Sequence, residues 1–569
     1  MLLSSRTGSS PGRRSLIVGA AGLAVSALLL TGCSSSSAET STEGGSSAET
    51  LTIFNGSTGT ITENFNPFST TALQPTLGVL FESLYWYNLA SEAEPTPLLA
   101  EGFEWNADGT ALTIHTREGV KWSDGEAFSA NDVAFTFNLV ASTPALNTTG
   151  IAATAEATDD NTVVLTFTEP SFMQEPNVLG NRAIVPEHIW KDVADPVTEI
   201  NSDPVGTGAF TVKSFSAQSY MLEANPSYWG GEPAVGDVRY IALDSADAAS
   251  AALVAGDVDW MSAYLPGLDD IISGNPDLSY VNTPSMTTAI FTCANADAGC
   301  VGPQTDPAVR QAIYAALNRD QLNKLAGGGF AAAASPTILL PERDKKWIAD
   351  DADLEVPSAP DTDAAGDLLD AAGWTLGSDG IRAKDGERLS MTIQTVTGWS
   401  DYISLNDAMT QQLAEVGIEL KASQVSWNEW NDAEQSGKFQ LSLDSIGLGA
   451  SSNPYFTYDK WFNSANTAPV GENAIAGNTS RFSDAAVDAA IAVARSTDDE
   501  AVQAEQYALI EDVIVEQMPY IPIYLNSMLT EFNTSRVTGW PTGDDKYAIP
   551  ASWKAWDNGI ILKSIKPAN

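Results

Sequence analysis

The chain has 569 residues, of which 73 are acidic and 28 are basic, so its formal net charge at pH 7 is −45. A surface this acidic repels nucleic acids and anionic lipid headgroups, and neither is expected as a binding partner. Only three cysteines and two histidines are present, which is too few, and too widely spaced, to favour a zinc site. We expect neither a metal nor another cofactor.

The first 32 residues have the pattern of a secretory signal peptide. Three arginines precede an apolar stretch, residues 16–30, that is too short to span a bilayer. The next residues, Leu30-Thr31-Gly32-Cys33, resemble the lipobox of bacterial lipoproteins. In such proteins the new N-terminal cysteine is acylated, so Cys33 is the expected lipidation site and palmitate one of its expected acyl groups. The alternative is an ordinary signal peptide followed by a chance cysteine. Export by the Sec or the twin-arginine route stays open.

Residues 33–50 form the predicted link between lipid and body. Serine, glycine, threonine and glutamate dominate this stretch, and it contains no large apolar side chain. It cannot offset the entropy lost on ordering, so we expect a flexible tether that reaches roughly 20 to 25 Å. Loss of the leader removes three arginines and no acid, which moves the formal net charge to −48. The sequence thus predicts a body held by lipid at the extracellular face of the cell membrane.

The body, from residue 51 to the C-terminus, is too long for one core, and two or three lobes are expected. Strand-like runs occur at 51–54, 162–167 and 389–393, and they alternate with amphipathic helical patterns. The predicted fold class is therefore α/β.

Several helices can be placed from their ends. Asp306 can cap a helix that has Pro307 at its first position and continues to the glycines at 327–329. A second is expected at 361–372, before Gly373. A pair is predicted at 483–495 and 499–517, and the stripe expected to be buried contains Val502, Leu509, Val513 and Ile514.

Cys293 and Cys300 remain once Cys33 is assigned to lipid. In an oxidising exterior two such cysteines are expected to form a disulfide. Two free buried thiols are the alternative.

Four blocks of the body, in order, resemble the family 5 extracellular solute-binding proteins, the peptide-binding class of ABC importer receptors. The first is REGVKWSDGEAF at 117–128 with NDVAF at 131–135. The others are PVGTGAF at 204–210 with NPSYWGG at 225–231, VRQAI at 309–313 with LNR at 317–319, and LL at 368–369 with AGW at 372–374. The residues themselves predict structure: the glycines at 206–208 and 230–231 suit turns or close backbone approach, and Trp122, Phe128 and Trp229 suit cores.

The resemblance implies a two-lobed clamp of the periplasmic-binding-protein type with an inserted third domain. Mapped onto this chain, the first lobe comprises 51–83, 206–300 and 524–569, the insert 84–205, and the second lobe 301–523. It also implies a monomer that binds an oligomeric solute between its lobes and delivers it to an ABC permease with separate ATPase subunits.

The ligand is predicted less directly. Peptide receptors of this family often carry an acidic residue that pairs with the α-ammonium group of the ligand. The corresponding region here is Gly447–Pro454, and it contains no carboxylate. Residues 214–220 and 398–399 also resemble the branch that binds β-linked oligosaccharides, whose sugars stack on flat rings. We therefore favour a short β-linked oligosaccharide over the peptide that is the family default. The candidate ligand-binding residues are Asn55, Trp399, Trp427, Trp430, Asn453, Trp461, Trp553 and Trp556, and core packing is the alternative for each tryptophan.

The other class considered is a secreted carbohydrate-active hydrolase. Such an enzyme needs two carboxylates at a suitable distance. Among 73 acidic residues some pair always meets this condition, so the presence of such a pair does not indicate an enzyme. The body from residue 51 contains no serine-nucleophile elbow, zinc-protease helix or phosphate-binding loop. We expect a receptor, not an enzyme.

Overall fold

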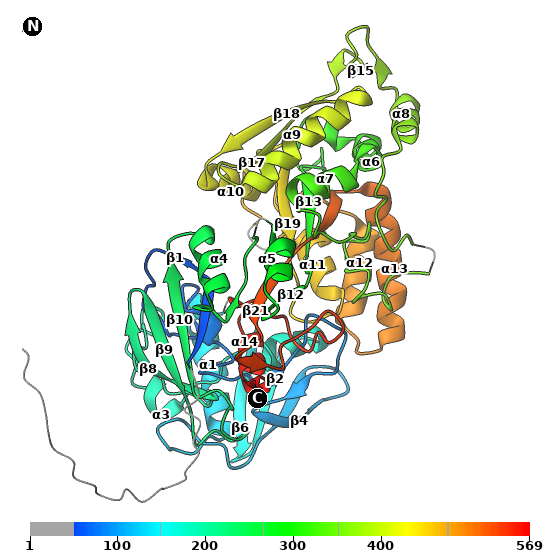
Figure 1. The fold of residues 1–569 in the computed structure, drawn as a ribbon. Helices are drawn as coiled ribbons and strands as arrows, with labels where there is room; N and C mark the ends of the chain where they lie inside the picture. Colours follow the sequence, from blue (N-terminus) through cyan, green and yellow to red (C-terminus); the bar gives the residue numbers. More distant parts are fainter. Residues whose placement is uncertain (1–49, 148, 266, 351, 475–476, 569) are drawn as a thin grey trace, which may run out of the picture. The chain divides into compact units, whose positions relative to one another are not determined.

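The structure is a computed structural model that describes residues 50–147, 149–265, 267–350, 352–474 and 477–568 (Figure 1). The predicted signal peptide, the lipidation site Cys33 and the tether up to residue 49 lie outside these ranges. Within them, no helix has both the length and the apolar character to cross a bilayer. Helices and strands alternate along the chain, which confirms the α/β class.

The first lobe is built on a seven-stranded mixed sheet. Its strands lie in the order β12 (Leu278–Asn282), β21 (Leu529–Asn533), β11 (Trp260–Met261), β1 (Leu51–Thr58), β10 (Asp237–Leu243), β9 (Ser219–Ala224) and β8 (Phe210–Ser216). The lobe also contains α4 (Ala246–Ala255), α5 (Leu268–Gly274), α14 (Asp557–Ser564), β22 (Val537–Thr538) and β23 (Lys566–Pro567). Its central strand, β1, is parallel to β10 and β11. The C-terminal part of the chain returns to this lobe through β21.

The inserted domain follows β1. Its four-stranded antiparallel sheet has the order β4 (Ala100–Trp105), β5 (Ala111–Thr116), β7 (Thr162–Phe167) and β6 (Ala153–Asp159). The remaining elements are β2 (Tyr85–Trp86), β3 (Thr96–Pro97), α1 (Ala130–Ser142), α2 (Glu175–Leu179) and α3 (Glu187–Trp190). Ser129 and Asp132 form a capping box at the start of α1, which packs against β6 and β7. Trp122 and Phe128 are buried in the core of this domain.

A buried carboxylate joins the insert to the first lobe. Glu82 has no exposed surface and accepts hydrogen bonds from Tyr228 Oη (2.7 Å), Trp229 Nε1 (2.7 Å) and Lys563 Nζ (3.3 Å). The guanidinium of Arg117 lies 4.3 Å from the centre of the Trp229 ring. One side chain therefore connects the start of the insert to the loop after β9 and to α14.

The glycines of the second family block allow a close backbone approach. A Cβ atom at Gly206 would collide with the carbonyl oxygen of Leu80, and one at Gly208 with that of Val79. Gly208 N also donates to Leu80 O at 3.0 Å. Any side chain at these positions would separate β8 from residues 79–80, which is the reason for glycine that the sequence suggested.

The second lobe is built on a five-stranded sheet with core residues on both faces. Its order is β18 (Glu419–Val425), β17 (Ser390–Val396), β19 (Leu441–Ile446), β13 (Met286–Thr292) and β20 (Tyr520–Asn526). Along β13, Ile290 enters one apolar cluster, whereas Ala289 and Phe291 enter the cluster on the opposite face. Figure 1 shows α9 (Ser400–Glu415) lying along β17 and β18, which it contacts.

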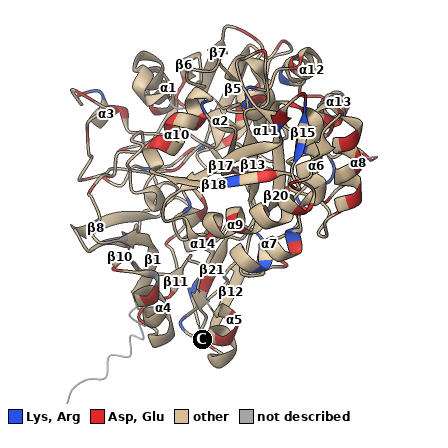
Figure 2. Ribbon diagram, turned by 90° about the horizontal axis from the view of Figure 1, so that it is seen from above, with Lys and Arg blue, Asp and Glu red and all other residues tan. Residues whose placement is uncertain are grey.

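Several further elements complete the second lobe. They are α6 (Pro307–Ala316), α7 (Arg319–Ala326), α8 (Thr362–Ala371), α10 (Trp427–Ser436), α11 (Tyr455–Phe462), α12 (Ala485–Arg495), α13 (Glu500–Gln517) and a small sheet of β14 (Thr375–Leu376), β15 (Arg382–Lys384) and β16 (Glu387–Arg388). Exposed acidic residues are visible along α8 and α13 (Figure 2). Apart from the buried Glu511, the acidic side chains of these two helices are exposed to solvent.

The predicted helix starts are correct, but one length and one buried stripe are wrong. Asp306 caps α6, and its side chain accepts a hydrogen bond from Ala308 N. The helix does not reach Gly327, because it ends at Ala316 and a new helix, α7, begins after Asn318, whose side chain accepts from Gln321 N. On α13, Leu509 is 55% exposed, whereas Tyr507 and Ile510 are buried.

The chain passes between the two large sheets twice. Residues 283–285 lead from β12 to β13, and residues 527–528 lead from β20 to β21. Thr283 N donates to Met528 O at 3.0 Å, so the two crossings are hydrogen-bonded neighbours. The lobe boundaries placed at 300/301 and 523/524 are therefore wrong, because β13 and β20 both pair within the second sheet.

Candidate functional site

A cavity of about 600 Å³ lies beside the two crossings. Residues 89–92 of the insert, 283–285 of the first crossing, 340–343 of the second lobe and 543–546 of the C-terminal segment contribute to its walls. Pockets that bind small molecules have volumes of roughly 300 to 1,000 Å³ and often lie between domains. This cavity has the size and the position expected for a ligand held by both lobes.

One hydrogen bond and one ion pair link the second lobe to the other parts of the body around this cavity. The buried guanidinium of Arg343 pairs with Asp344, and its Nη1 donates to the carbonyl oxygen of Leu89 at 3.2 Å. Across the same cavity, Lys546 Nζ lies 2.9 Å from Glu342 Oε2. The basic groups on the cavity wall are thus engaged in contacts between lobes.

A second cavity, of about 370 Å³, lies between the insert and the second lobe. Tyr87 and Glu175 line it from the insert, and Asn453 lines it from the second lobe. Tyr87 Oη donates to Glu175 Oε1 at 2.9 Å. Burial raises the pKa of Glu175 above its ordinary value, and burial together with the Glu175 charge raises the pKa of Tyr87. Lys346, paired with Glu92 and Glu500, stands at its edge.

The structure brings two of the predicted tryptophans together at the end of β17. The rings of Trp399 and Trp430 have centroids 5.2 Å apart, and Trp399 also lies 5.5 Å from Tyr402. The Tyr402 hydroxyl forms a hydrogen bond with Ser445, whose hydroxyl bonds that of Thr288 at 3.2 Å. An aromatic and hydroxyl-bearing row therefore runs from α10 to β13.

Trp427 is the most exposed of the predicted tryptophans. It lies in the first turn of α10, where Ser426 and Glu429 form a capping box, and its side chain is 54% exposed. Trp430, one turn later, is only 6% exposed. The two faces of α10 thus differ: Trp430 packs inward against Trp399, while Trp427 presents its ring to solvent.

The other candidate residues have different surroundings. Asn453 accepts from Tyr455 N and Tyr507 Oη and donates to Gln503, so its amide is committed to local structure. Asn55 Oδ1 accepts from the Ser57 backbone and hydroxyl at the irregular end of β1.

Trp461 packs in the core and is not a wall of either cavity. Its ring makes edge contacts with Phe291 at 5.5 Å and with Tyr520 at 5.7 Å, and only 9% of the residue is exposed. Its surroundings are those of a core residue, and a ligand-binding role for Trp461 stays a prediction. Trp553 is 40% exposed, whereas Trp556 is half-buried against the core of the first lobe.

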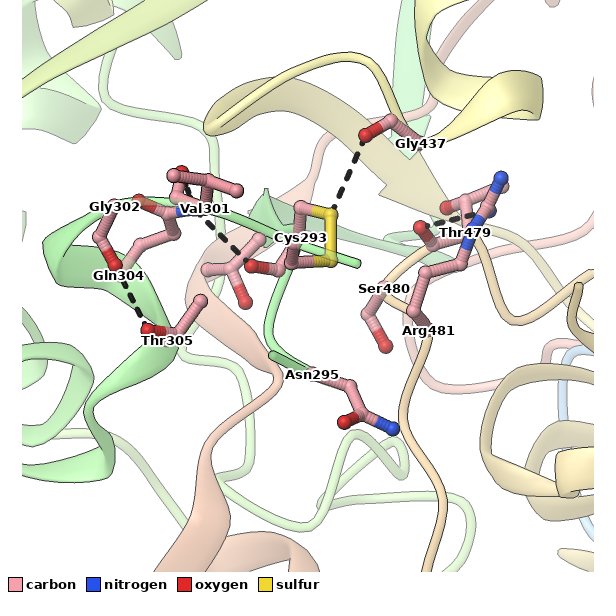
Figure 3. Close-up of a disulfide and its surroundings, with 12 residues drawn as sticks. Cys293, Asn295, Val301, Gly302, Gln304, Thr305, Gly437, Thr479, Ser480 and Arg481 are labelled. Atoms are coloured by element: carbon pink, nitrogen blue, oxygen red, sulfur yellow. Dashed lines mark hydrogen bonds between the residues drawn. A yellow bond between two sulfur atoms is a disulfide. The ribbon is translucent and has the colours of Figure 1, made fainter. Parts of the chain in front are cut away.

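The two cysteines of the body form a disulfide in the structure. The Cα atoms of Cys293 and Cys300 are 5.5 Å apart, and the closed loop lies beside Gly437 and Ser480 (Figure 3). Ala294 N donates to Ser480 O at 2.8 Å. Next to it, the buried Arg481 donates to the carbonyl oxygen of Gln435 at 2.6 Å. The disulfide loop thus packs against the segment where α10 ends.

Sequence reasoning missed the residues that line the larger cavity. Thr283, Ser285, Arg343 and Lys546 come from parts of the chain that are far apart, and none stands in a motif. Their proximity depends on the two chain crossings, which have no local signal.

The family model for bacterial extracellular solute-binding proteins, family 5 (Middle), matches residues 94–468. Protein XP55 of Streptomyces lividans is 30% identical over 429 residues, which cover 73% of this chain and 72% of that protein. The oligopeptide-binding protein AppA of Bacillus subtilis is 27% identical over 443 residues, covering 75% and 77%.

Solved structures share the fold. The periplasmic oligopeptide-binding protein of an oligopeptide ABC transporter from Thermotoga maritima superposes with a TM-score of 0.81 at 24% identity, over 92% of this chain and all of that one. A second structure of that protein, with mannohexaose bound, gives a TM-score of 0.72 at 23% identity, over 92% and 99%. These likenesses confirm the two-lobed fold with its insert. From the family match and the extent of the relatives, the chain belongs to the bacterial extracellular solute-binding proteins of family 5.

Proposed function

We propose that this protein is the substrate-binding component of an ABC importer, which captures an oligomeric solute between its lobes and delivers it to a permease. The family match over residues 94–468 is the observation that carries this proposal. The double crossing between the sheets and the cavities beside it supply a matching geometry. Hydrolysis of ATP belongs to a separate subunit, and the receptor acts as a monomer without chemistry of its own.

Lobe closure is the proposed mechanism of capture. Contacts that a ligand makes with both lobes only in the closed arrangement shift the population toward that arrangement. Closure then presents the loaded receptor to the permease.

For the ligand we favour a short β-linked oligosaccharide over a peptide. The stretch 447–454 has no carboxylate for a peptide's ammonium group, and Trp427 presents an exposed ring for a sugar face. A fold relative has mannohexaose bound. Peptides are the ligands named for several relatives, such as AppA and the glutathione-binding protein of Shigella flexneri, and they form the comparison arm of the test.

Trp427→Ala is expected to weaken binding of the preferred oligosaccharide at least tenfold, because a ring stacked on a sugar is lost. The melting temperature is expected to change little, since the side chain is more than half exposed. Titration calorimetry with mannohexaose, cello-oligomers, xylo-oligomers and mixed oligopeptides measures both ligand class and affinity. Leu509→Ala, which removes an equally exposed apolar group from α13, is the control. Tight binding of peptides alone would refute the saccharide preference.

We further propose that Cys33 carries the lipid that holds the receptor at the outer face of the membrane. A tethered receptor stays at a high effective concentration near its permease. Cys33→Ser is expected to leave ligand affinity unchanged and to impair uptake by cells. Normal uptake with the released protein would show that the anchor is not needed for transport.

A further inference from the structure

The loop at residues 327–331 is fixed to the second lobe at its C-terminal end. The side chain of Asn323, on α7, donates to Ala331 O at 2.8 Å and accepts from Ala331 N at 3.1 Å. The next residue, Ala332, exchanges two backbone hydrogen bonds with Leu525 of β20, at 3.1 and 2.8 Å. This part of the loop must therefore move with the second sheet.

The same loop inserts a side chain into the first lobe. Phe330 packs edge-on against Tyr280 of β12, with ring centroids 6.0 Å apart and planes at 86°. It also covers the apolar cluster beneath α4 and α5, which includes Leu253, Leu268 and Leu278. Phe330 thus belongs to a segment of the second lobe, but its side chain packs into the first lobe.

Asn282 joins three segments at this point. Its Nδ2 donates to the carbonyl oxygen of Phe330 at 2.7 Å, and its Oδ1 accepts from Met528 N at 3.1 Å. One amide therefore holds the end of β12, the loop and the second crossing together. Both of its hydrogen bonds would have to adapt if the sheets rotated about the crossings.

The loop has the backbone to form such a contact and to release it. Gly328 and Gly329 both have positive φ, +59° and +85°, which side-chain-bearing residues rarely adopt. A Cβ atom at Gly328 would lie 2.8 Å from the ring of Tyr264 in the first lobe. Glycine is thus required where the loop meets Tyr264, and it leaves the link to α7 free to change conformation.

We propose that the present arrangement is the open one, and that residues 327–331 form a latch that holds it and must be released when the lobes close on a ligand. Rotation about the crossings carries Ala331 and Ala332 with the second sheet, while Tyr280 stays with the first, so Phe330 has to leave its cluster. The latch sets the fraction of receptor that is already closed without ligand, and through that fraction the apparent affinity. The inference rests on the proposed clamp function.

The test measures lobe arrangement in the full-length chain without ligand. Two dyes are attached through an azide-bearing amino acid at Gln218, exposed in the turn between β8 and β9 of the first lobe, and at Lys421, exposed on β18 of the second. Single-molecule energy transfer then gives the distribution of lobe separations. Phe330→Ala is expected to raise the ratio of closed to open molecules about tenfold, as follows from losing a partly buried phenylalanine.

Asn282→Asp keeps the acceptor for Met528 N and removes the donor to Phe330, so it is expected to shift the distribution in the same direction. Phe215→Ala, a half-buried phenylalanine that contacts Phe65 within the first lobe, is the matched control and should leave the distribution unchanged. If folded Phe330→Ala and Asn282→Asp proteins both keep the wild-type distribution, the latch does not exist. Adding mannohexaose or mixed oligopeptides to the wild-type protein tests the clamp function separately. If the lobes do not close on these ligands, the proposed function fails, but the comparison of ligand-free wild type and variants still tests the latch.

Discussion

Glu531→Gln is expected to stabilise the protein near pH 8 and to flatten its stability profile between about pH 4 and pH 8. Glu531 lies on β21, opposite Tyr280 of β12 and Met261 of β11, and none of its surface is exposed. Hydrogen bonds from the backbone N–H groups of Ala263 and of Glu531 itself lower its pKa, but by less than burial raises it. Burial raises its pKa from 4.5 to about 8.

The sign follows from proton binding. Between pH 4.5 and 8 the folded protein keeps this proton and the unfolded chain has lost it, so stability falls as pH rises through this range. The full effect on the free energy of unfolding is on the order of 4 kcal/mol, because each tenfold difference in proton affinity between the two states contributes about 1.4 kcal/mol. Glutamine cannot ionise and does not contribute this loss.

Urea unfolding at pH 5, 6, 7 and 8 measures the effect as the difference between wild type and variant. Other buried acids with raised pKa values, such as Asp557 at about 6, are present in both proteins and cancel. Glu104→Gln on the exposed side of β4 is the control. Parallel profiles for wild type and Glu531→Gln would contradict a buried, protonated Glu531.

Glu82→Ala is expected to cost about 3 to 5 kcal/mol of unfolding free energy, because it leaves buried donors unpaired. Tyr228 Oη, Trp229 Nε1 and Lys563 Nζ all lose their common acceptor. The contact joins three parts of the chain, so the insert is expected to lose its coupling to the first lobe in the same experiment. Denaturant unfolding followed by tryptophan fluorescence measures both effects.

Two variants distinguish the effect of losing the buried hydrogen bonds from the effect of losing one negative charge. Glu82→Gln keeps one acceptor and should cost less than the alanine substitution. Asp237→Ala removes a partner of Lys213 from a solvated pair on the first lobe and should change stability little. Equal stability of Glu82→Ala and wild type would show that the network does not hold the insert in place.

The features that could be predicted from sequence are those with a local cause. Asp306 followed by Pro307 starts α6 because a short acidic side chain can accept from the free backbone N–H groups of a first turn. Gly206 and Gly208 similarly mark a place where only a backbone without Cβ fits. In the first case neighbours in sequence decide the conformation, whereas in the second the residue type signals a close contact with Val79 and Leu80, which are distant in sequence.

The features that could not be predicted depend on distant parts of the chain. β13 has an apolar pattern that suits either sheet, and its pairing with β19 and β20 decides that it belongs to the second lobe. Trp461 and Trp427 look alike in sequence, yet one is packed between Phe291 and Tyr520 while the other faces solvent. Arg343 reaches the cavity only because the crossings bring its loop near Leu89. Burial and proximity of this kind are properties of the assembled fold.

The central claim is that this protein captures an oligomeric solute and returns it unchanged. Native mass spectrometry of the full chain incubated with mannohexaose, cello-oligomers, xylo-oligomers and oligopeptides tests it most directly. We predict a complex of one protein with one ligand, and a ligand of unchanged mass after release. Products shorter than the added oligomer would show an enzyme, and the absence of any complex across the panel would contradict the receptor function.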